Sequence, residues 1–142
     1  MIYAVIDTNV IVSALLSPHN DSGTAVIRNY LLEGKIIPLY NEEIFQEYQD
    51  VLHRSKFHFP EALIDRIIDA ISQMGIMLDR TKTEEIFTDP KDVVFYEVAL
   101  SKKGSYLVTG NTKHFPSTPI VVTPAELLRI IESQKLSSPP HR

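Results

Sequence analysis

The sequence predicts an α/β fold, in which a parallel β-sheet carries helices on both of its faces. The first observation is that short β-prone runs alternate along the chain with helical segments. The second is the composition, since 44% hydrophobic and 23% charged residues are typical of a globular protein. The third is the length of 142 residues, which suits one domain that buries a core without disulfide bonds.

Five β-prone runs are predicted as strands. The first begins at Ile2 and is stopped by Asp7, which interrupts the apolar run. Gly75 separates the third run from the helix before it, and Gly110 marks the turn after the fourth. The predicted strands are residues 2–6, 35–40, 76–78, 105–109 and 119–122.

The helical segments have apolar residues at a helical period, together with start and stop signals. Asn41 can open one helix, Gly34 stops another, and a capping box begins at Thr123. We predict one domain over residues 1–134 and a disordered tail over 135–142. The predicted helices are residues 10–16, 24–33, 41–52, 62–74, 91–102 and 124–133, with a loop at 19–23.

Charge and composition exclude several classes of protein. With 14 Lys+Arg against 18 Asp+Glu the net charge is −4, which argues against a broad basic surface for nucleic acid. The absence of cysteine excludes disulfides, Cys–zinc sites, iron–sulfur clusters and thiol nucleophiles. No run approaches about 18 apolar residues and no basic segment precedes Ile2, so we expect a soluble cytoplasmic protein without a membrane span or signal peptide.

Polar residues that follow strands are the first candidates for a site, because ligands of open parallel sheets bind beyond the carboxyl ends of the strands. Asp7 follows the first strand, and Thr109 and Asn111 follow the fourth. Asp92 lies in the first turn of a predicted helix and reaches the same end if that turn folds over the sheet edge. Each acid also has a plainer explanation, since Asp7 can cap a helix and Asp92 can interact with a helix dipole.

Two helical glutamates and three histidines complete the set of candidates. Glu47 lies about 100° from the centre of the apolar face of its helix, so it can lean inward or stay in water at the boundary. Glu97 lies on a helix that is apolar nearly all round, so it must have a structural partner (Lys or Tyr), be protonated or lie near a metal. His53, His58 and His114 lack the spacing of zinc ligands and are expected to lie at the surface or to contact phosphate.

The candidate residues occur in a characteristic order along the chain. The motifs are Asp7-Thr8-Asn9 after a strand, Glu47 on a helix, Asp89-Pro90-Lys91-Asp92, and Tyr106-Leu107-Val108-Thr109-Gly110-Asn111 with Lys113-His114-Phe115-Pro116. Over about residues 1–131 the chain thereby resembles the PIN domain family, and most of all the VapC-like ribonucleases, which are toxins of toxin–antitoxin systems. The resemblance implies a three-layer α/β/α PIN-like fold with a central, mostly parallel sheet of four to five strands.

The resemblance also implies an activity, which is the metal-dependent hydrolysis of RNA phosphodiester bonds. It assigns the metal-binding acids to Asp7, Glu47 and Asp92, and a strand-end hydroxyl to Thr109. The fourth acid of the family falls at Asn111, which is neutral. We therefore expect weaker binding of a second ion and a lower or narrower activity.

Auxiliary roles follow from the same resemblance. Asn9 is expected to orient the acid cluster, and Asp89 or Glu97 to compensate for the missing charge at Asn111. Asp89 is equally suited to a plain helix cap. Basic residues that flank the motifs are either phosphate contacts or ordinary solvated loop charges, and they are Lys91, Lys113 and His114.

Oxygen ligands suit Mg²⁺ or Mn²⁺ as the cofactor. The implied partners are RNA, a small antitoxin protein and a second copy in a homodimer. The main alternative is a PIN-like module that binds RNA or protein with weak or no activity, which Asn111 favours and the three acids disfavour. A dehalogenase-type phosphotransferase fits less well, because it needs an Asp where Asn9 stands, and a receiver domain needs further acids after the first strand.

Overall fold

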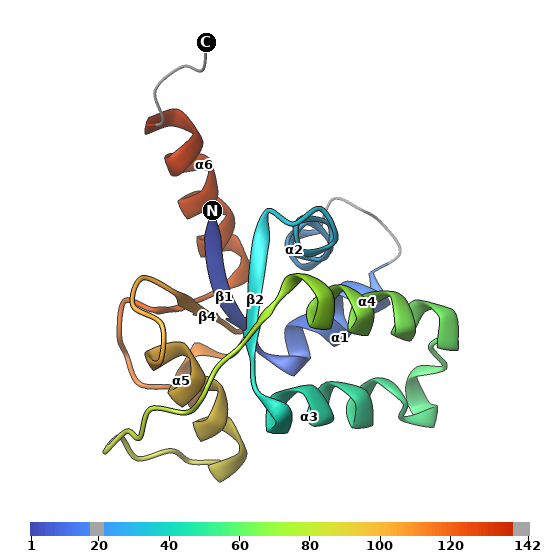
Figure 1. The fold of residues 1–142 in the computed structure, drawn as a ribbon, viewed down its shortest axis with the longest axis horizontal. Coiled ribbons are helices and arrows are strands. Elements are labelled where there is room, and N and C mark those ends of the chain that lie inside the picture. The colour runs from blue at the N-terminus through green and yellow to red at the C-terminus, as the bar shows by residue number, and fades with distance from the viewer. Residues whose placement is uncertain (18–21, 138–142) are drawn as a thin grey trace.

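The computed structural model describes residues 1–17 and 22–137, which form an α/β fold (Figure 1). Within these residues, five strands make one sheet in the order β3-β2-β1-β4-β5. Every neighbouring pair of strands is parallel, which confirms the predicted parallel α/β fold. The strands are β1 (Ile2–Ile6), β2 (Ile36–Tyr40), β3 (Ile76–Met77), β4 (Tyr106–Val108) and β5 (Val121–Val122).

The first strand of the chain, β1, is the central strand of the sheet. It pairs with β2 on one side, where Ile2 lies opposite Ile36, and with β4 on the other, where Ile6 lies opposite Val108. Parallel strands end at the same edge of a sheet, so the segments that follow β1, β2 and β4 come together there.

Helices cover both faces of the sheet. Figure 1 shows α1, α2 and α4 on one side, α5 on the other, and α3 beneath the carboxyl ends of the strands. None of the described helices is both long and apolar enough to cross a membrane. The α-helices are α1 (Thr8–Leu16), α2 (Gly23–Leu32), α3 (Glu42–Leu52), α4 (Glu61–Met74), α5 (Val93–Leu100) and α6 (Pro124–Ser137). Short 3₁₀ helices are η1 (Ser55–Phe57), η2 (Pro90–Asp92) and η3 (Thr112–His114).

Two predicted helix starts are confirmed by their caps. The Asn41 side chain accepts a hydrogen bond from the Ile44 backbone N–H at 2.9 Å and so begins α3. At the start of α6, the Thr123 N–H donates to Glu126 at 2.9 Å and the Glu126 N–H donates to the Thr123 hydroxyl at 3.1 Å. These reciprocal bonds are the capping box that the sequence predicts.

Other boundaries differ from the prediction. α6 continues to Ser137 instead of ending near Ser133, so the start of the predicted tail is helical. The helix predicted over 91–102 begins with the 3₁₀ helix η2, and its α-helical part is only α5. The predicted loop at 19–23 lies largely outside the described residues, although Gly23 already begins α2. Residues 138–142 of the predicted tail also lie outside them.

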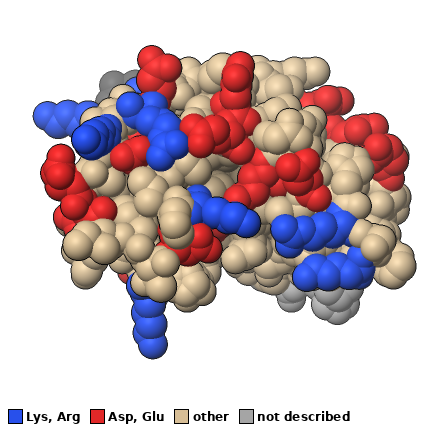
Figure 2. Space-filling view, turned by 90° about the horizontal axis from the view of Figure 1, so that it is seen from below, with Lys and Arg blue, Asp and Glu red and all other residues tan. Residues whose placement is uncertain are grey.

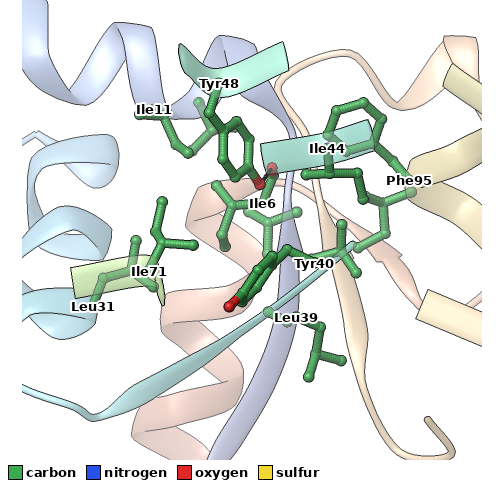
Figure 3. Close-up of a cluster of buried hydrophobic side chains, with 14 of the residues drawn as sticks. Ile6, Ile11, Leu31, Leu39, Tyr40, Ile44, Tyr48, Ile71 and Phe95 are labelled. Carbon is green, nitrogen blue, oxygen red and sulfur yellow. Dashed lines mark hydrogen bonds between the residues drawn. The ribbon is translucent and has the colours of Figure 1, made fainter. Parts of the chain in front are cut away.

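The buried side chain of Tyr48 ties α3 to the end of the central strand (Figure 3). Its hydroxyl donates a hydrogen bond to the carbonyl oxygen of Ile6. Its ring lies 6.5 Å from the ring of Phe95 on α5, measured between centroids. Because Ile6 immediately precedes Asp7, the packing of the core fixes the backbone from which Asp7 projects.

Candidate active site

The candidate residues converge on the edge of the sheet where the strands end. Asp7 follows β1, α3 with Glu47 follows β2, Thr109 follows β4, and η2 with Asp92 leads into α5. Figure 2 views the molecule from this side, and acidic side chains are spread across the face with groups of basic side chains between them. The fold thus brings acids from three distant parts of the chain toward one end of the sheet.

Asp7 is buried, and Thr109 holds its carboxylate. The fully buried hydroxyl of Thr109 donates to Asp7 Oδ2 at 2.7 Å, and the Asp7 N–H donates to the carbonyl of Val108 at 2.9 Å. Asp7 occupies the cap position of α1, but its side chain makes no capping hydrogen bond of ordinary geometry. Burial raises the pKa of Asp7, although Thr109 and the nearby backbone N–H groups of Thr8 and Asn9 work in the opposite direction. A simple helix-capping role therefore does not describe Asp7.

Glu47 leans inward from α3, as its position on the helix allows. The Thr8 hydroxyl donates a hydrogen bond to Glu47 Oε2, and the side chain is half-buried. Burial, followed by the charges of Asp7 and Glu47, raises the pKa of Tyr48. The Tyr48 hydroxyl therefore stays protonated and keeps donating to the end of β1.

Asp92 combines a raised pKa with a buried oxygen that has no hydrogen-bond partner in the described part of the chain. Burial, and after it the negative charges of Asp7, Asp89 and Glu47, raises the pKa of Asp92 to about 6, although His114 lowers it. Its Oδ2 atom is buried and has no hydrogen-bond partner among the described residues. The ring nitrogen Nδ1 of His114 lies 3.8 Å from this Asp92 oxygen. A buried carboxylate oxygen without a donor is the position at which a cation would be stabilising.

The three acids do not form a ready-made chelate. Within residues 1–17 and 22–137, no group of three or more His, Asp or Glu side chains is arranged to hold a metal ion. The donors are nevertheless oxygen atoms, and Mg²⁺ commonly binds only one or two protein carboxylates while keeping several waters. The Asp92 Oδ2 atom, which lacks a hydrogen-bond donor among the described residues, is one oxygen that could hold such an ion.

A family model for the PIN domain matches residues 3–113. The chain belongs to the PIN domain family. PIN domains are generally nucleases and typically use divalent metals. No curated protein and no solved structure matched the chain.

Around the acids of this PIN domain, the auxiliary polar residues are mostly exposed. The Asn111 N–H donates to the Thr109 hydroxyl at 3.0 Å, and its side-chain amide lies 3.3 Å from His114 Nε2. The side chain of Asn9 is exposed, so it is the Asn9 backbone that faces Asp7. Lys91 and Lys113 are exposed and form no ion pair with any described residue.

Glu97 of the PIN domain has a structural partner, which corrects the expectation that it could serve the acid cluster. Its Oε1 accepts from Arg80 Nε at 2.8 Å, and its Oε2 accepts from the Thr83 N–H at 2.9 Å. Burial alone would raise the pKa of Glu97, but the bonds from Thr83 and Arg80 lower it. Arg80 also bonds both oxygens of Glu43 at 3.0 Å and so joins α5 to α3. The partner is thus an arginine, where the sequence predicts Lys or Tyr.

Asp89 is exposed, and its Oδ1 accepts from the Lys91 N–H at 2.9 Å. This is the plain capping role that the sequence left open. Thr8, Tyr48 and Arg80 are the positioning residues that sequence reasoning missed. Thr8 directly follows Asp7 in the sequence, and Tyr48 directly follows Glu47. This adjacency to a candidate acid is the sequence feature that could have identified both residues.

Replacing Arg80 with methionine is expected to lower the free energy of unfolding by about 2 kcal/mol, because the buried Glu97 carboxylate loses its charged partner. Urea denaturation of the wild type and Arg80→Met measures the loss. Arg66→Met, at an exposed position of α4, is the matched control and should stay within about 0.5 kcal/mol of the wild type. In the double variant with Glu97→Gln, the cost should be smaller than the sum of the two single changes.

Proposed function

We propose that this PIN domain is a Mg²⁺- or Mn²⁺-dependent ribonuclease that hydrolyses RNA phosphodiester bonds, and that it is the toxin of a toxin–antitoxin pair. The observation that carries the proposal is the buried, unpartnered Asp92 Oδ2 beside two further carboxylates. The family match supports nuclease chemistry, and the oxygen donors support a hard divalent ion.

In this proposal Asp7, Glu47 and Asp92 hold the ion. When bound, the ion activates water and offsets negative charge at the phosphate. Thr109 keeps the Asp7 carboxylate in place by donating to it, and Thr8 does the same for Glu47. Each hydroxyl donates to one oxygen of its carboxylate, Oδ2 of Asp7 and Oε2 of Glu47.

The substrate phosphate meets the other polar groups of the same edge. The Asn111 amide contributes an oxygen or an N–H donor without adding charge, so a second ion is held weakly. We assign Lys91, Lys113 and His114 to the phosphate groups of the RNA, since all three side chains are exposed beside the acids. A small antitoxin, a homodimer and a cytoplasmic location complete the proposal, and their support is the resemblance to VapC-like toxins.

The test is cleavage of a labelled single-stranded RNA in Mn²⁺, in Mg²⁺ and in excess chelator. We expect cleavage that needs the metal and that is lost in Asp7→Asn. Calorimetric titration with Mn²⁺ distinguishes the enzyme from an inactive binding module, the possibility that Asn111 favours. Equal cleavage by Asp7→Asn, or no binding at millimolar Mn²⁺, would overturn the proposal.

A further inference from the structure

The segment between α3 and α4 concentrates positive charge in an otherwise acidic protein. Residues 53–58, here called the basic turn, hold four basic side chains, and no acid occurs between Asp50 and Glu61. All four basic side chains are exposed. His53 is engaged by Glu61, with 2.8 Å between Nε2 and Oε2. The basic side chains without an ion pair among the described residues are Arg54, Lys56 and His58.

A groove of about 640 Å³ runs along α3 and is lined both by Glu47, one of the candidate acids, and by Arg54 of the basic turn. Glu47, Val51 and Arg54 line it along one stripe of α3 and its C-terminal end, and Lys91 and Val94 line it from the side of α5. From Glu47 to Leu52, the last residue of α3, the chain advances five positions, or about 7 Å along the helix axis, and Arg54 follows two residues later. A nucleic-acid strand bound at the acids would therefore reach Arg54 within a few nucleotides.

The basic turn is held firmly against the body of the protein. The rings of Phe57 and Phe59 stack with centroids 5.3 Å apart and pack against the hydrophobic core. The Lys56 ammonium lies 5.1 Å from the centroid of the Phe57 ring. The Arg54 N–H donates to the Val51 carbonyl at 3.1 Å. The backbone that carries these cations is therefore fixed before a ligand binds, which lowers the entropic cost of binding.

Acidic side chains in the groove restrict where phosphates can bind. Glu43 is neutralised by Arg80, but Glu42 and Asp50 remain as negative charges on the wall. The cations that line the groove are Lys91 and Arg54, so favourable phosphate contacts within it are confined to these two points. Lys56 lies outside the lining, two positions beyond Arg54 in the basic turn. A flexible single strand can span these two points.

We propose that Arg54 and Lys56 bind backbone phosphates of a single-stranded RNA whose scissile phosphate lies at the acids, so that the basic turn is an RNA-binding extension of the active site. The inference rests on the proposed function. RNA is favoured over an acidic protein partner because the groove runs continuously from Glu47 to the turn.

The first experiment measures binding apart from cleavage. The protein carries Asp7→Asn and the buffer contains no metal, so that the RNA is not cleaved. Fluorescence anisotropy then gives the affinity for a labelled single-stranded RNA of about 12 nucleotides, a length within the usual range for one binding site. The affinity is measured over a range of salt concentrations. Replacing both cations (R54Q/K56Q) should weaken binding about tenfold and reduce the slope of log affinity against log salt by about 1.4, the value for two lost phosphate contacts. The control K35Q/K103Q removes the same charge near the amino ends of β2 and β4 and should leave the slope unchanged.

The second experiment measures cleavage in the otherwise wild-type protein. R54Q/K56Q should raise KM for the long RNA about tenfold and leave the cleavage rate of a dinucleotide unchanged. An unchanged salt slope, or an equal loss in K35Q/K103Q, overturns the inference. If the wild type does not cleave RNA but the salt slope depends on Arg54 and Lys56, the proposed function fails while RNA binding by the turn stands.

Discussion

At neutral pH, Asp92→Asn should make the protein more stable by about 1 kcal/mol and lower RNA cleavage by at least about 100-fold. The loss of activity follows from the proposed role of Asp92 as a metal ligand. Replacing a residue that only supports a ligand already lowers metal affinity or activity by about 10–100-fold in such sites. The gain follows from removing a carboxylate that is partly buried beside Asp7 and Glu47. Opposite changes in stability and activity are typical of a site in which like charges are held close together for function.

The sign of the stability change depends on pH. Folding raises the pKa of Asp92 from 3.8 to about 6, so the folded protein favours the protonated carboxyl. The contribution of the protonated Asp92 carboxyl to the free energy of unfolding is fully present below about pH 4, and it is lost as the pH rises through about 6. This rise in pKa corresponds to at most about 3 kcal/mol, and solvent screening of a side chain that is partly exposed reduces it to about 1 kcal/mol.

Urea denaturation of both proteins in excess chelator, at pH 4 and at pH 7.5, measures the effect. The wild type and Asp92→Asn should coincide at the lower pH and separate at the higher one. Asp69 is an exposed acid on α4, and Asp69→Asn controls for the change in net charge. This variant should match the wild type in stability at both pH values and in RNA cleavage. A variant that is less stable than the wild type at pH 7.5 would contradict the repulsion between the acids.

Gly75→Ala should destabilise the protein by about 3 kcal/mol or more, although Gly75 has a backbone conformation open to any residue. The turn between α4 and β3 passes closely over β2 at this point. A β-carbon there would lie 2.4 Å from the carbonyl oxygen of Ile71 and 2.6 Å from that of Pro38. Two backbone oxygens cannot move aside as a flexible side chain could, so α4 or the edge of the sheet must shift.

The midpoint of urea denaturation compares Gly75→Ala with Gly110→Ala. A β-carbon at Gly110 meets no atom within 4 Å, so this control should stay within about 0.5 kcal/mol of the wild type. Equal stability of the two variants would show that the turn over β2 can relax without cost.

The sequence predicts the sheet and most helices because its local signals agree with the fold. The apolar run before Asp7, the cap at Asn41 and the capping box at Thr123 each describe their own segment, and all three are confirmed. The predicted end of α6 near Ser133 is too early, since the next residues are mostly helix-forming and carry no stop signal before Ser137.

Within the site, positions at strand ends could be predicted and long-range partners could not. Asp7 and Thr109 meet because β1 and β4 are neighbours, which follows from the fold. Arg80 lies in a connection without helical or strand periodicity, so nothing in its surroundings links it to Glu97. The Asp92 oxygen without a donor is also a property of the folded structure alone.

The central place of β1 in the sheet separates Asp7 from its support in the order of synthesis. Asp7 follows β1, but the hydroxyl that orients it belongs to a residue 102 positions later. Contacts between residues so far apart in sequence slow the folding of a domain. A nascent chain that still lacks β4 therefore has an incomplete sheet and an Asp7 without the hydroxyl that holds its carboxylate.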